Sequence, residues 1–416
     1  MVITNYWVDM NFLFMILLLF LIIIVFQFYF VRKTSNTILH LFPRIKLELF
    51  KKIRWIFVAY VNLLPVGILL GVVYYFITKD IIEFPPLSII INYLFVLPFW
   101  IYFVILLQSI VFFLIIDVIR LVTYPVYKKH KDQILNGIYK AQFVLVIFFS
   151  VYVPARIIYD FNSVEIREVQ YHRPVDERLK SAKIVLISDI QADPYTNDAR
   201  LSRFVNKVNS LNPDLILIAG DLITSGKYFV DISAKYSGML KSKNGVYSCV
   251  GDHDNWVDRS NTEQSLRTVE EALAKKNVFM LDNENRYFDI NGAKVEVSFV
   301  TNTYVETIKN EALKTITNGG QPADFKIFLT HQPRQKLIDA AIKNNYNMYL
   351  AGHTHGGQIT LLFPFINLSP TLFETNYVKG DFYFGDMLMI VTRGLGMSLA
   401  PVRYNATPEI TLITFK

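Results

Sequence analysis

Five apolar runs in the second half of the chain each end in residues of the types that bind metal ions. The residues at these ends are Asp189 and Gln191, Asp221 after Gly220, the run Gly251–Asp254, His331, and the run Gly352–His355. Buried strands of an α/β sheet read as such apolar runs, and binding sites collect at the carboxyl ends of parallel strands. The series therefore predicts a cleft in which carboxylates, an amide and imidazoles converge on a cation.

Each of these residues has an ordinary structural explanation when it is considered alone. An aspartate after a strand is more often a helix cap or a turn residue than a metal ligand. Four of the seven histidines of the chain nevertheless lie in these blocks. The joint occurrence of the blocks supports a metal site, and no single block does.

The elements that must position these residues begin near Ser163, where the composition becomes that of a globular protein. Amphipathic stretches predict helices over residues 200–210, 230–240, 262–276 and 334–343. In addition to the runs above, strands are predicted over residues 287–290, 294–300, 387–392 and 409–414. Because one parallel sheet does not need so many strands, we expect an α/β domain over residues 161–416 with two packed sheets flanked by helices.

Residues 1–160 carry most of the apolar excess of the chain. Hydrophobic residues make up 52% of the sequence and charged residues only 19%, which is too apolar for an ordinary soluble protein and indicates a membrane region. Spans are predicted over residues 12–31, 55–77, 88–116 and 141–155. The fourth is short, and an interfacial helix is its alternative. Arg32 and Lys33 follow the first span, whereas a cleavable signal peptide carries its basic residues first, so this span is expected to be retained.

The distribution of basic residues among the loops predicts the orientation of the membrane region. The loop after the first span contains seven Lys and Arg residues, the next loop contains only Lys79, and the third contains five. The positive-inside rule places the first and third loops in the cytoplasm. With four spans, the N-terminus and the C-terminal domain then face outward. If the fourth segment only lies on the membrane surface, the domain is cytoplasmic.

The net charge of +7 does not indicate a nucleic-acid partner. The basic residues crowd the N-terminal loops, whereas a nucleic-acid-binding domain gathers Lys and Arg on one folded face. A transporter is also poorly supported, because the predicted spans carry almost no ionisable residue apart from Asp117 near a helix end. The lone Cys249 excludes an internal disulfide framework.

The ordered blocks resemble those of the calcineurin-like metallophosphoesterases. That family shows D-x-H, G-D, G-N-H-[DE], a lone His and G-H-x-H, and this chain has Asp189-Ile190-Gln191, Gly220-Asp221, Gly251-Asp252-His253-Asp254, His331 and Gly352-His353-Thr354-His355. The continuation Gly356-Gly357-Gln358 and the tail TRGLG…PVRYN resemble a bacterial, often membrane-attached branch, which includes hydrolases of lipid-linked diphosphates. The resemblance covers residues 180–416 and implies a four-layer α/β/β/α sandwich.

The resemblance also implies a centre of two divalent metal ions. Two such ions about 4 Å apart can hold a phosphoryl oxygen, activate a water and stabilise the leaving oxygen. Asp221 would bridge both ions. The remaining ligands would be Asp189, Gln191 and His355 for the first ion, and Asp252, His331 and His353 for the second.

Four further residues receive roles from the same resemblance. His253 would act as the general acid at the leaving oxygen, and Asp254 would orient it. Arg393 and Arg403 match the tail motifs and would contact phosphate, although structural roles for both remain open.

Two residues depart from the family pattern. Gln191 stands where the family usually has His, and Asp252 stands where it usually has Asn. Oxygen-rich sites with some imidazole suit Mn²⁺ or Fe²⁺, and Zn²⁺ remains possible. We hypothesise that the added carboxylate disfavours a dianionic monoester and leaves diesters or diphosphodiesters as the better substrates. Both departures could also mark an inactive site, although both replacement residues can coordinate a metal.

The segment over residues 361–373, LLFPFINLSPTLF, is apolar for a loop and follows the last predicted ligand. An ordinary core is one explanation. The alternative is a lip that touches the bilayer and admits a lipid tail.

The sequence therefore predicts an integral protein of a bacterial cell membrane with an extracytoplasmic, metal-dependent phosphoesterase domain. The expected reaction is hydrolysis of a phosphodiester or diphosphate bond in a lipid or a lipid-linked nucleotide. A tethered phosphodiesterase for soluble substrates and a catalytically silent membrane sensor or scaffold are the alternatives.

Overall fold

The structure, a computed structural model, describes residues 2–78, 89–318, 320–363 and 366–416. The chain divides into two compact units, the first comprising residues 1–157 and 361–367, and the second comprising residues 158–360 and 368–416. The division lies close to the boundary expected at residue 160. The sequence did not predict that residues 361–367 group with the N-terminal helices.

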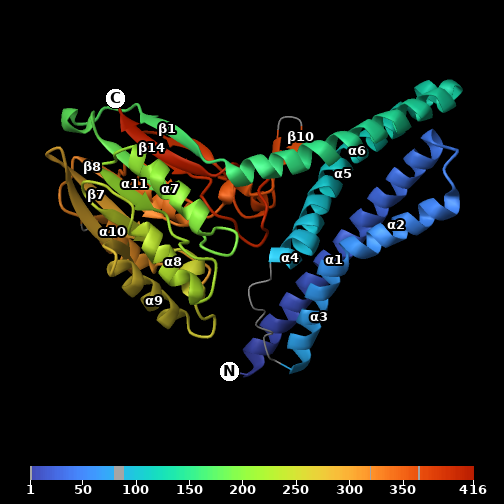
Figure 1. Cartoon of the computed structure of the whole chain (residues 1–416). Helices are drawn as coiled ribbons and strands as arrows, with labels where there is room; N and C mark the ends of the chain where they lie inside the picture. Colours follow the sequence, from blue (N-terminus) through green and yellow to red (C-terminus); the bar gives the residue numbers. More distant parts are fainter. Residues whose placement is uncertain (1, 79–88, 319, 364–365) are drawn as a thin grey trace. The chain divides into compact units, whose positions relative to one another are not determined.

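The first unit is helical (Figure 1). Its helices are α1 (Val2–Leu41), α2 (Leu47–Val61), α3 (Leu63–Thr78), α4 (Ile89–Ile91), the π-helix η1 (Asn92–Val96), α5 (Leu97–Tyr127), the 3-10 helix η2 (Lys128–His130) and α6 (Lys131–Asn162). By length and composition, three stretches of the described chain can cross a membrane, and the bent pair α2–α3 adds a fourth. These correspond to the four expected spans. Lys79 and Ser88, at the predicted second loop and the start of the third span, lie outside the described residues.

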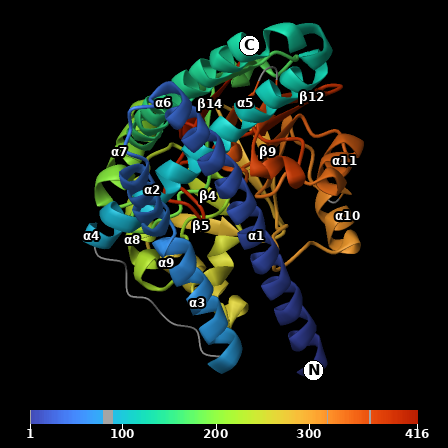
Figure 2. The same ribbon diagram turned by 90° about the vertical axis from the view of Figure 1, so that its right-hand side faces the viewer.

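The second expected span is not a straight helix. A bend of 43° separates α2 from α3 at Asn62 (Figure 2). The Asn62 Nδ2 donates to the Gln27 Oε1 of α1 at 3.0 Å and to the Val58 carbonyl at 2.7 Å. Because polar groups in lipid must be satisfied inside the protein, this pair ties α1 to the bend.

The fourth expected span is longer than predicted. It lies in a helical stretch over residues 128–162, which meets the length and composition of a membrane span. The last turn of α6 belongs to the second unit, where the buried Asp160 accepts a hydrogen bond from the Thr407 hydroxyl at 2.5 Å.

The apolar segment over residues 361–367 is tied to α5 within the first unit. It forms part of a hairpin of β10 (Leu361–Phe363) and β11 (Ile366–Leu368). The fully buried Gln108 of α5 accepts a hydrogen bond from the Leu362 amide at 2.7 Å and donates one to the Leu362 carbonyl at 2.9 Å. Phe365 lies outside the described residues.

The first sheet of the second unit has six strands in the order β1-β14-β2-β3-β4-β5. These are β1 (Glu165–Tyr171), β14 (Glu409–Phe415), β2 (Lys183–Ile187), β3 (Leu215–Ile218), β4 (Val246–Cys249) and β5 (Val278–Leu281). Strands β2 to β5 are parallel, and β14 runs antiparallel to β2. Their carboxyl ends therefore share one edge.

The second sheet has six strands in the order β12-β13-β9-β8-β7-β6. These are β12 (Gly380–Phe384), β13 (Met387–Val391), β9 (Met348–Ala351), β8 (Phe325–Thr330), β7 (Ala293–Val300) and β6 (Glu284–Ile290). The four central strands are parallel, and both edge strands are antiparallel to their neighbours.

Three apolar clusters hold the second unit together in four layers. Leu186 and Leu217 of the first sheet pack with Ile327 of the second. The other face of the first sheet packs against α7 (Asp198–Ser210), α8 (Tyr228–Ser237) and α9 (Thr262–Ala274), and that of the second sheet against α10 (Asn310–Asn318) and α11 (Gln335–Lys343). The predicted four-layer α/β/β/α sandwich is confirmed. Both faces of each sheet are buried, which explains why the strands read as continuous apolar runs.

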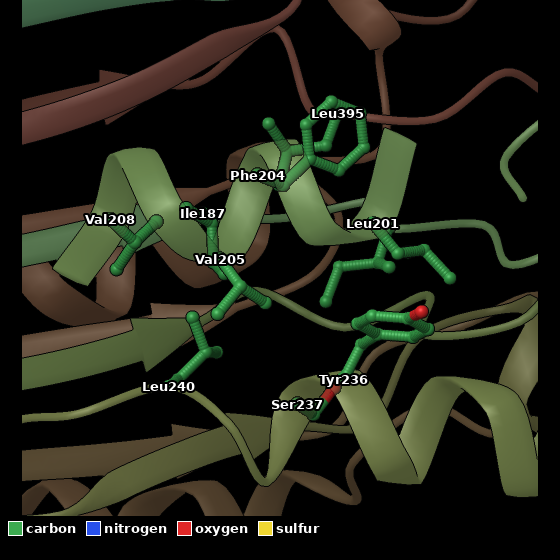
Figure 3. Close-up of a pocket in the computed structure, with 10 residues that line it drawn as sticks. Ile187, Leu201, Phe204, Val205, Val208, Tyr236, Ser237, Leu240 and Leu395 are labelled. Carbon is green, nitrogen blue, oxygen red and sulfur yellow. The ribbon is translucent and has the colours of Figure 1, made fainter. Parts of the chain in front are cut away.

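The packing of α7 on the first sheet illustrates this core. Leu201, Phe204, Val205 and Val208 of α7 pack around Ile187 of β2 (Figure 3). The gap left among them has a volume of about 10 Å³, and Tyr236 and Ser237 also line it. It is a packing gap that is too small to hold a ligand.

Candidate metal centre

The expected metal ligands all follow the carboxyl ends of central strands. Asp189 and Gln191 follow β2, Asp221 follows β3, Asp252 follows β4, His331 follows β8, and His353 and His355 follow β9. The structure brings six of these residues into two groups, Asp189 with Asp221 and His355, and Asp252 with His331 and His353. Within each group the ligand atoms lie within 4.8 Å of one another.

The first group contains buried oxygens without a hydrogen-bond partner. The His355 Nε2 lies 3.4 Å from the Asp189 Oδ1, and the Gln191 Nε2 donates to the Asp221 Oδ2 at 2.7 Å. In the described part of the chain, the Asp189 Oδ1 and the Gln191 Oε1 accept no hydrogen bond. Since a buried polar atom left unpaired is destabilising, these oxygens fit a divalent cation.

The second group converges on the carboxylate of Asp252. The His353 Nδ1 lies 2.9 Å and the His331 Nε2 3.3 Å from the Asp252 Oδ2. The same His331 nitrogen lies 3.4 Å from the Asp221 Oδ2. Asp221 therefore borders both groups, which is the position that a bridging carboxylate requires.

A hydrogen bond occupies one ring nitrogen of His331 and leaves the other nitrogen available to a metal ion. The His331 Nδ1 lies 2.7 Å from the Ala219 carbonyl oxygen, so this nitrogen carries the proton. Nε2 then faces Asp221 and Asp252 and is the nitrogen that can bind a metal ion. Imidazole ligands of metals are commonly oriented in this way.

The charges in the centre shift the pKa values of its histidines in opposite directions. Burial disfavours the charged form of His353, but hydrogen bonds with Asp252 and Glu374 raise its pKa to about 9. Burial, and then the positive charge of Arg403, lower the pKa of His355 to about 4. His355 thus offers a neutral ring near pH 7, whereas His353 would release a proton on binding a metal ion.

The backbone at these positions is strained. Asp189, Gln191, Asp221, His353 and His355 have φ angles of 50°, 49°, 59°, 71° and 49°. Positive φ values are uncommon for residues other than glycine and gather at functional sites. Gly251 is needed for a related reason, because a Cβ at this position would lie 2.1 Å from the Asp221 amide nitrogen.

His253 borders the centre without joining either ligand group. Its amide donates to the Asp221 Oδ1 at 2.8 Å, and its Nδ1 lies 2.6 Å from the Thr224 carbonyl oxygen. The Nε2 lies 3.2 Å from the Ser398 hydroxyl. The ring is therefore fixed through Nδ1 and presents Nε2.

The side chain of Asp254, which was expected to orient His253, makes its hydrogen bonds with backbone amides. Its carboxylate accepts hydrogen bonds from the amides of Gly251, Asp221 and Leu222 at 2.9, 3.0 and 2.9 Å. These bonds occupy the side chain, and the Thr224 carbonyl orients His253 in its place. Burial, and then the charge of Asp221, raise the pKa of Asp254 to about 6.

The two arginines expected to contact phosphate have structural contacts. Arg393 pairs with Glu409 at 2.7 Å and Glu165 at 2.6 Å. Arg403 is fully buried and donates to the carbonyls of Gly396, Arg393, Ala406 and His355. These contacts agree with the structural roles that the sequence left open for both arginines, and Arg403 fixes the backbone of His355. Contact of either arginine with phosphate stays a prediction.

Sequence reasoning missed three residues that touch the second group. The Gln332 Nε2 lies 2.8 Å from both oxygens of Asp252, and the Tyr304 amide donates to the Asp252 Oδ1 at 2.7 Å. The Glu374 Oε1 lies 3.0 Å from the His353 Nε2. Of these three, only Gln332 could have been found from the sequence, because it directly follows the expected ligand His331.

Comparison with known proteins agrees with this geometry. The family model described as calcineurin-like phosphoesterase matches residues 182–357. The metallophosphoesterase YkuE of Bacillus subtilis (strain 168) is 30% identical over 240 residues, which cover 56% of this chain and 79% of that relative. The chain belongs to the calcineurin-like metallophosphoesterase family.

The chain is also similar to proteins whose names refer to a membrane or to a lipid. A transmembrane protein with metallophosphoesterase domain from Bos taurus is 30% identical over 247 residues, 54% of this chain. The UDP-2,3-diacylglucosamine pyrophosphatase LpxG of Chlamydia muridarum (strain MoPn / Nigg) is 28% identical over 278 residues, covering 56% of this chain and 84% of that relative. The chain spans about half of the length of the Bos taurus relative, 54%.

Replacing Asp254 tests its structural role. Asp254→Ala leaves three buried amides without an acceptor. Each unsatisfied amide lowers the free energy of unfolding by about 1–3 kcal/mol. We therefore expect the unfolding temperature of the metal-free protein to fall by roughly 10 °C. Thermal unfolding in detergent after chelation measures this. Asp258→Ala, at an exposed aspartate that accepts from Ser260, is the control and should change little. An unchanged unfolding temperature in Asp254→Ala would contradict the assignment.

Proposed function

We propose that the protein hydrolyses a phosphodiester or diphosphate bond in a lipid or a lipid-linked nucleotide with two divalent metal ions. The observation that carries this proposal is the pair of ligand groups that meet at Asp221. Bound ions would supply Lewis-acid chemistry at a phosphoryl oxygen and lower the pKa of a water molecule.

Different residues of this chain would bind the two ions and supply the proton. Asp189, Gln191, Asp221 and His355 would hold one ion, and Asp221, Asp252, His331 and His353 would hold the other. We propose Mn²⁺ or Fe²⁺ in preference to Zn²⁺, because carboxylate and amide oxygens make up half or more of the donors. His253 would donate a proton from Nε2 to the leaving oxygen, since Thr224 fixes its Nδ1.

The charge of the centre supports a diester or diphosphate substrate. Asp189, Asp221 and Asp252 are all buried, and the neutral amide of Gln332 is the side chain that faces both oxygens of Asp252. A dianionic monoester would meet a more negative site than it would if Asp252 were asparagine. Two negative charges about 8 Å apart repel each other by about 2 kcal/mol at an effective dielectric constant of about 20.

Exposed apolar side chains beside the centre support a lipid substrate. Phe373 is 99% exposed and directly precedes Glu374, which contacts His353. Leu399 is 95% exposed and directly follows Ser398, which contacts His253. We call Phe373 and Leu399 the apolar rim. Apolar side chains exposed next to polar groups of a reaction centre can bind an apolar part of a substrate.

Gln358 holds Leu399 in this position. Its Nε2 donates to the carbonyls of Ser398 and Ala400 at 2.7 and 2.9 Å, and its Oε1 accepts from the Ser398 amide at 2.8 Å. The φ of Leu399 is +63°, an unfavourable conformation for leucine. A strained turn that presents an apolar side chain to solvent supports a role in binding.

The helices of the first unit associate the protein with a membrane. We propose that the membrane is a bacterial cell membrane and that the catalytic domain lies outside the cytoplasm. The four candidate spans and the seven, one and five basic residues of the successive loops support this orientation.

Removing single ligands tests the two-ion centre. We expect Asp221→Asn and His353→Ala to lower Mn²⁺-dependent hydrolysis of bis-p-nitrophenyl phosphate at least roughly hundredfold. Asp221→Asn removes the negative charge and one oxygen of the carboxylate between the two groups, and His353→Ala removes a nitrogen donor of one ion. Steady-state kinetics of the purified full chain measure the loss. His172→Ala removes an exposed histidine of the same unit as a control. Activity that persists in both ligand variants would rule out the assignment.

Removing the charge of Asp252 tests the preference for diesters. We expect Asp252→Asn to raise the ratio of kcat/KM for p-nitrophenyl phosphate to that for bis-p-nitrophenyl phosphate by roughly tenfold, since the dianion gains most from the lost charge. Asp214→Asn, at a buried aspartate that pairs with Lys243, is the matched control. Equal changes in both rates would contradict the explanation.

Polar replacements in the apolar rim test the lipid substrate. We expect Phe373→Ser with Leu399→Ser to lower kcat/KM for CDP-diacylglycerol in mixed micelles by roughly tenfold or more, because each apolar side chain covered by lipid contributes about 1.5–3 kcal/mol. The rate with CDP-glycerol, which has the same diphosphate and no acyl chain, should stay within about twofold. Ile342→Ser removes an exposed apolar side chain of α11 as a control. Equal losses on both substrates would favour a soluble substrate.

A further inference from the structure

A polar cluster that none of the sequence blocks contains surrounds the second ligand group. Its members are Asn302, Tyr304, Gln332, Arg334 and Glu374, and their side chains or backbone amides connect to Asp252 and His353. We call this set the Arg334 bracket. It lies wholly within the second unit.

One arm of the bracket holds Asp252. The Gln332 Nε2 donates to both oxygens of Asp252 at 2.8 Å. The Gln332 Oε1 accepts from the Arg334 Nε at 2.9 Å and from the Asn302 Nδ2 at 3.1 Å. With two donors at its oxygen, the Gln332 amide cannot be reversed, so its NH₂ group must face Asp252.

The other arm holds His353. The Glu374 Oε1 lies 3.0 Å from the His353 Nε2 and also accepts from the Tyr304 hydroxyl at 2.6 Å and from the Arg334 guanidinium. The carboxylate holds a proton on the His353 Nε2, so Nδ1, which faces Asp252, is the nitrogen that can release its proton and bind a metal ion. A carboxylate behind a metal-binding histidine commonly fixes the ring and raises its basicity.

Arg334 connects the two arms. Its Nε bonds to Gln332 and its terminal nitrogen to Glu374, so one planar guanidinium fixes the spacing between them. Arg334 directly precedes α11, and its carbonyl accepts the amides of Leu337 and Ile338 at 3.0 and 3.1 Å. The centre of the bracket is therefore anchored to a helix.

The first ligand group is held in a different way. His355 is fixed from its backbone by Arg403, and Asp189 accepts hydrogen bonds from the Ser188 hydroxyl and the His353 amide. Among the described residues, the hydrogen bonds of Arg334 and Glu374 reach no side chain of this group. Loss of the bracket should therefore affect one ion and spare the other.

We propose that Gln332, Arg334 and Glu374 are positioning residues that fix Asp252 and His353 and thereby set the affinity of the second metal site. This inference rests on the proposed two-ion centre. Gln332 and Glu374 touch the ligands, Arg334 acts through these two residues, and none of the three needs to touch the substrate.

A Mn²⁺ titration tests the proposal. Mn²⁺ is added to the chelator-treated full chain in detergent, and electron paramagnetic resonance measures the free Mn²⁺. The wild type should bind two ions. In Glu374→Ala and in Arg334→Met, the Kd of one ion should rise by roughly 10–100-fold while that of the other stays within about twofold. Glu374→Gln keeps an acceptor oxygen at this position and should show a smaller rise.

Matched controls distinguish this effect from a general loss of structure. Arg286→Met and Glu284→Gln remove an exposed ion pair of β6 and should leave both Kd values unchanged. Unfolding temperatures of the metal-free variants show whether each one folds, and Glu374→Gln remains informative if Glu374→Ala does not.

The possible results separate the bracket from the centre itself. If the wild type binds two ions and the Glu374 and Arg334 variants bind them equally well, the bracket proposal is wrong and the two-ion centre stands. Equal weakening of both ions would also overturn the bracket. A wild type that binds no Mn²⁺, Fe²⁺ or Zn²⁺ would remove the proposed function and the bracket with it.

Discussion

Mutual repulsion of three buried carboxylates is the constraint on which the second unit depends. Asp189, Asp221 and Asp252 are almost fully buried and border the same two ligand groups. Burying a charge is unfavourable unless an opposite charge compensates it. His331 can supply part of this compensation, because burial opposes its protonation but the carboxylates of Asp221 and Asp252 raise its pKa well above the usual value. Divalent cations would supply it more completely.

The rest of the centre serves to hold loops in conformations that the carboxylates require. Buried charged side chains that bond to the backbone hold the strained positive φ values at the expected ligands. The Asp254 carboxylate accepts hydrogen bonds from the amides of Gly251, Asp221 and Leu222. The Arg403 guanidinium donates to the carbonyls of His355 and Gly396. Charged residues next to a catalytic motif can therefore be structural, even where the motif suggests chemistry.

The sequence predicted the central strands and the polar residues that follow them, because both depend on local pattern. Apolar runs of buried strands ended at the ligands, so β2, β3, β4, β8 and β9 and their loops were expected. Helix α10 and strands β1, β5 and β12 were not predicted. Of these, β12 is an edge strand whose side chains are only partly buried, which weakens its apolar signal. Glu374 escaped prediction because its partner His353 is brought close only by the tertiary fold. The backbone roles of Asp254 and Arg403 have the same cause, since hydrogen-bond partners distant in the chain leave no periodic pattern.

The two ligand groups differ in what supports them, and this difference connects the metal centre to the apolar rim. Backbone contacts through Arg403 support the first group. The second group is supported by Gln332, Arg334 and Glu374, which lie just outside the ends of β8, α11 and the short helix η6 (Pro370–Phe373). Phe373 ends η6 in solvent, and the next residue, Glu374, contacts His353. Because consecutive residues serve both functions, the position of η6 determines both the apolar surface offered to a lipid and the orientation of a metal ligand. A backbone shift there would change both at once, which is a reason for Arg334 to hold Glu374 from a helix.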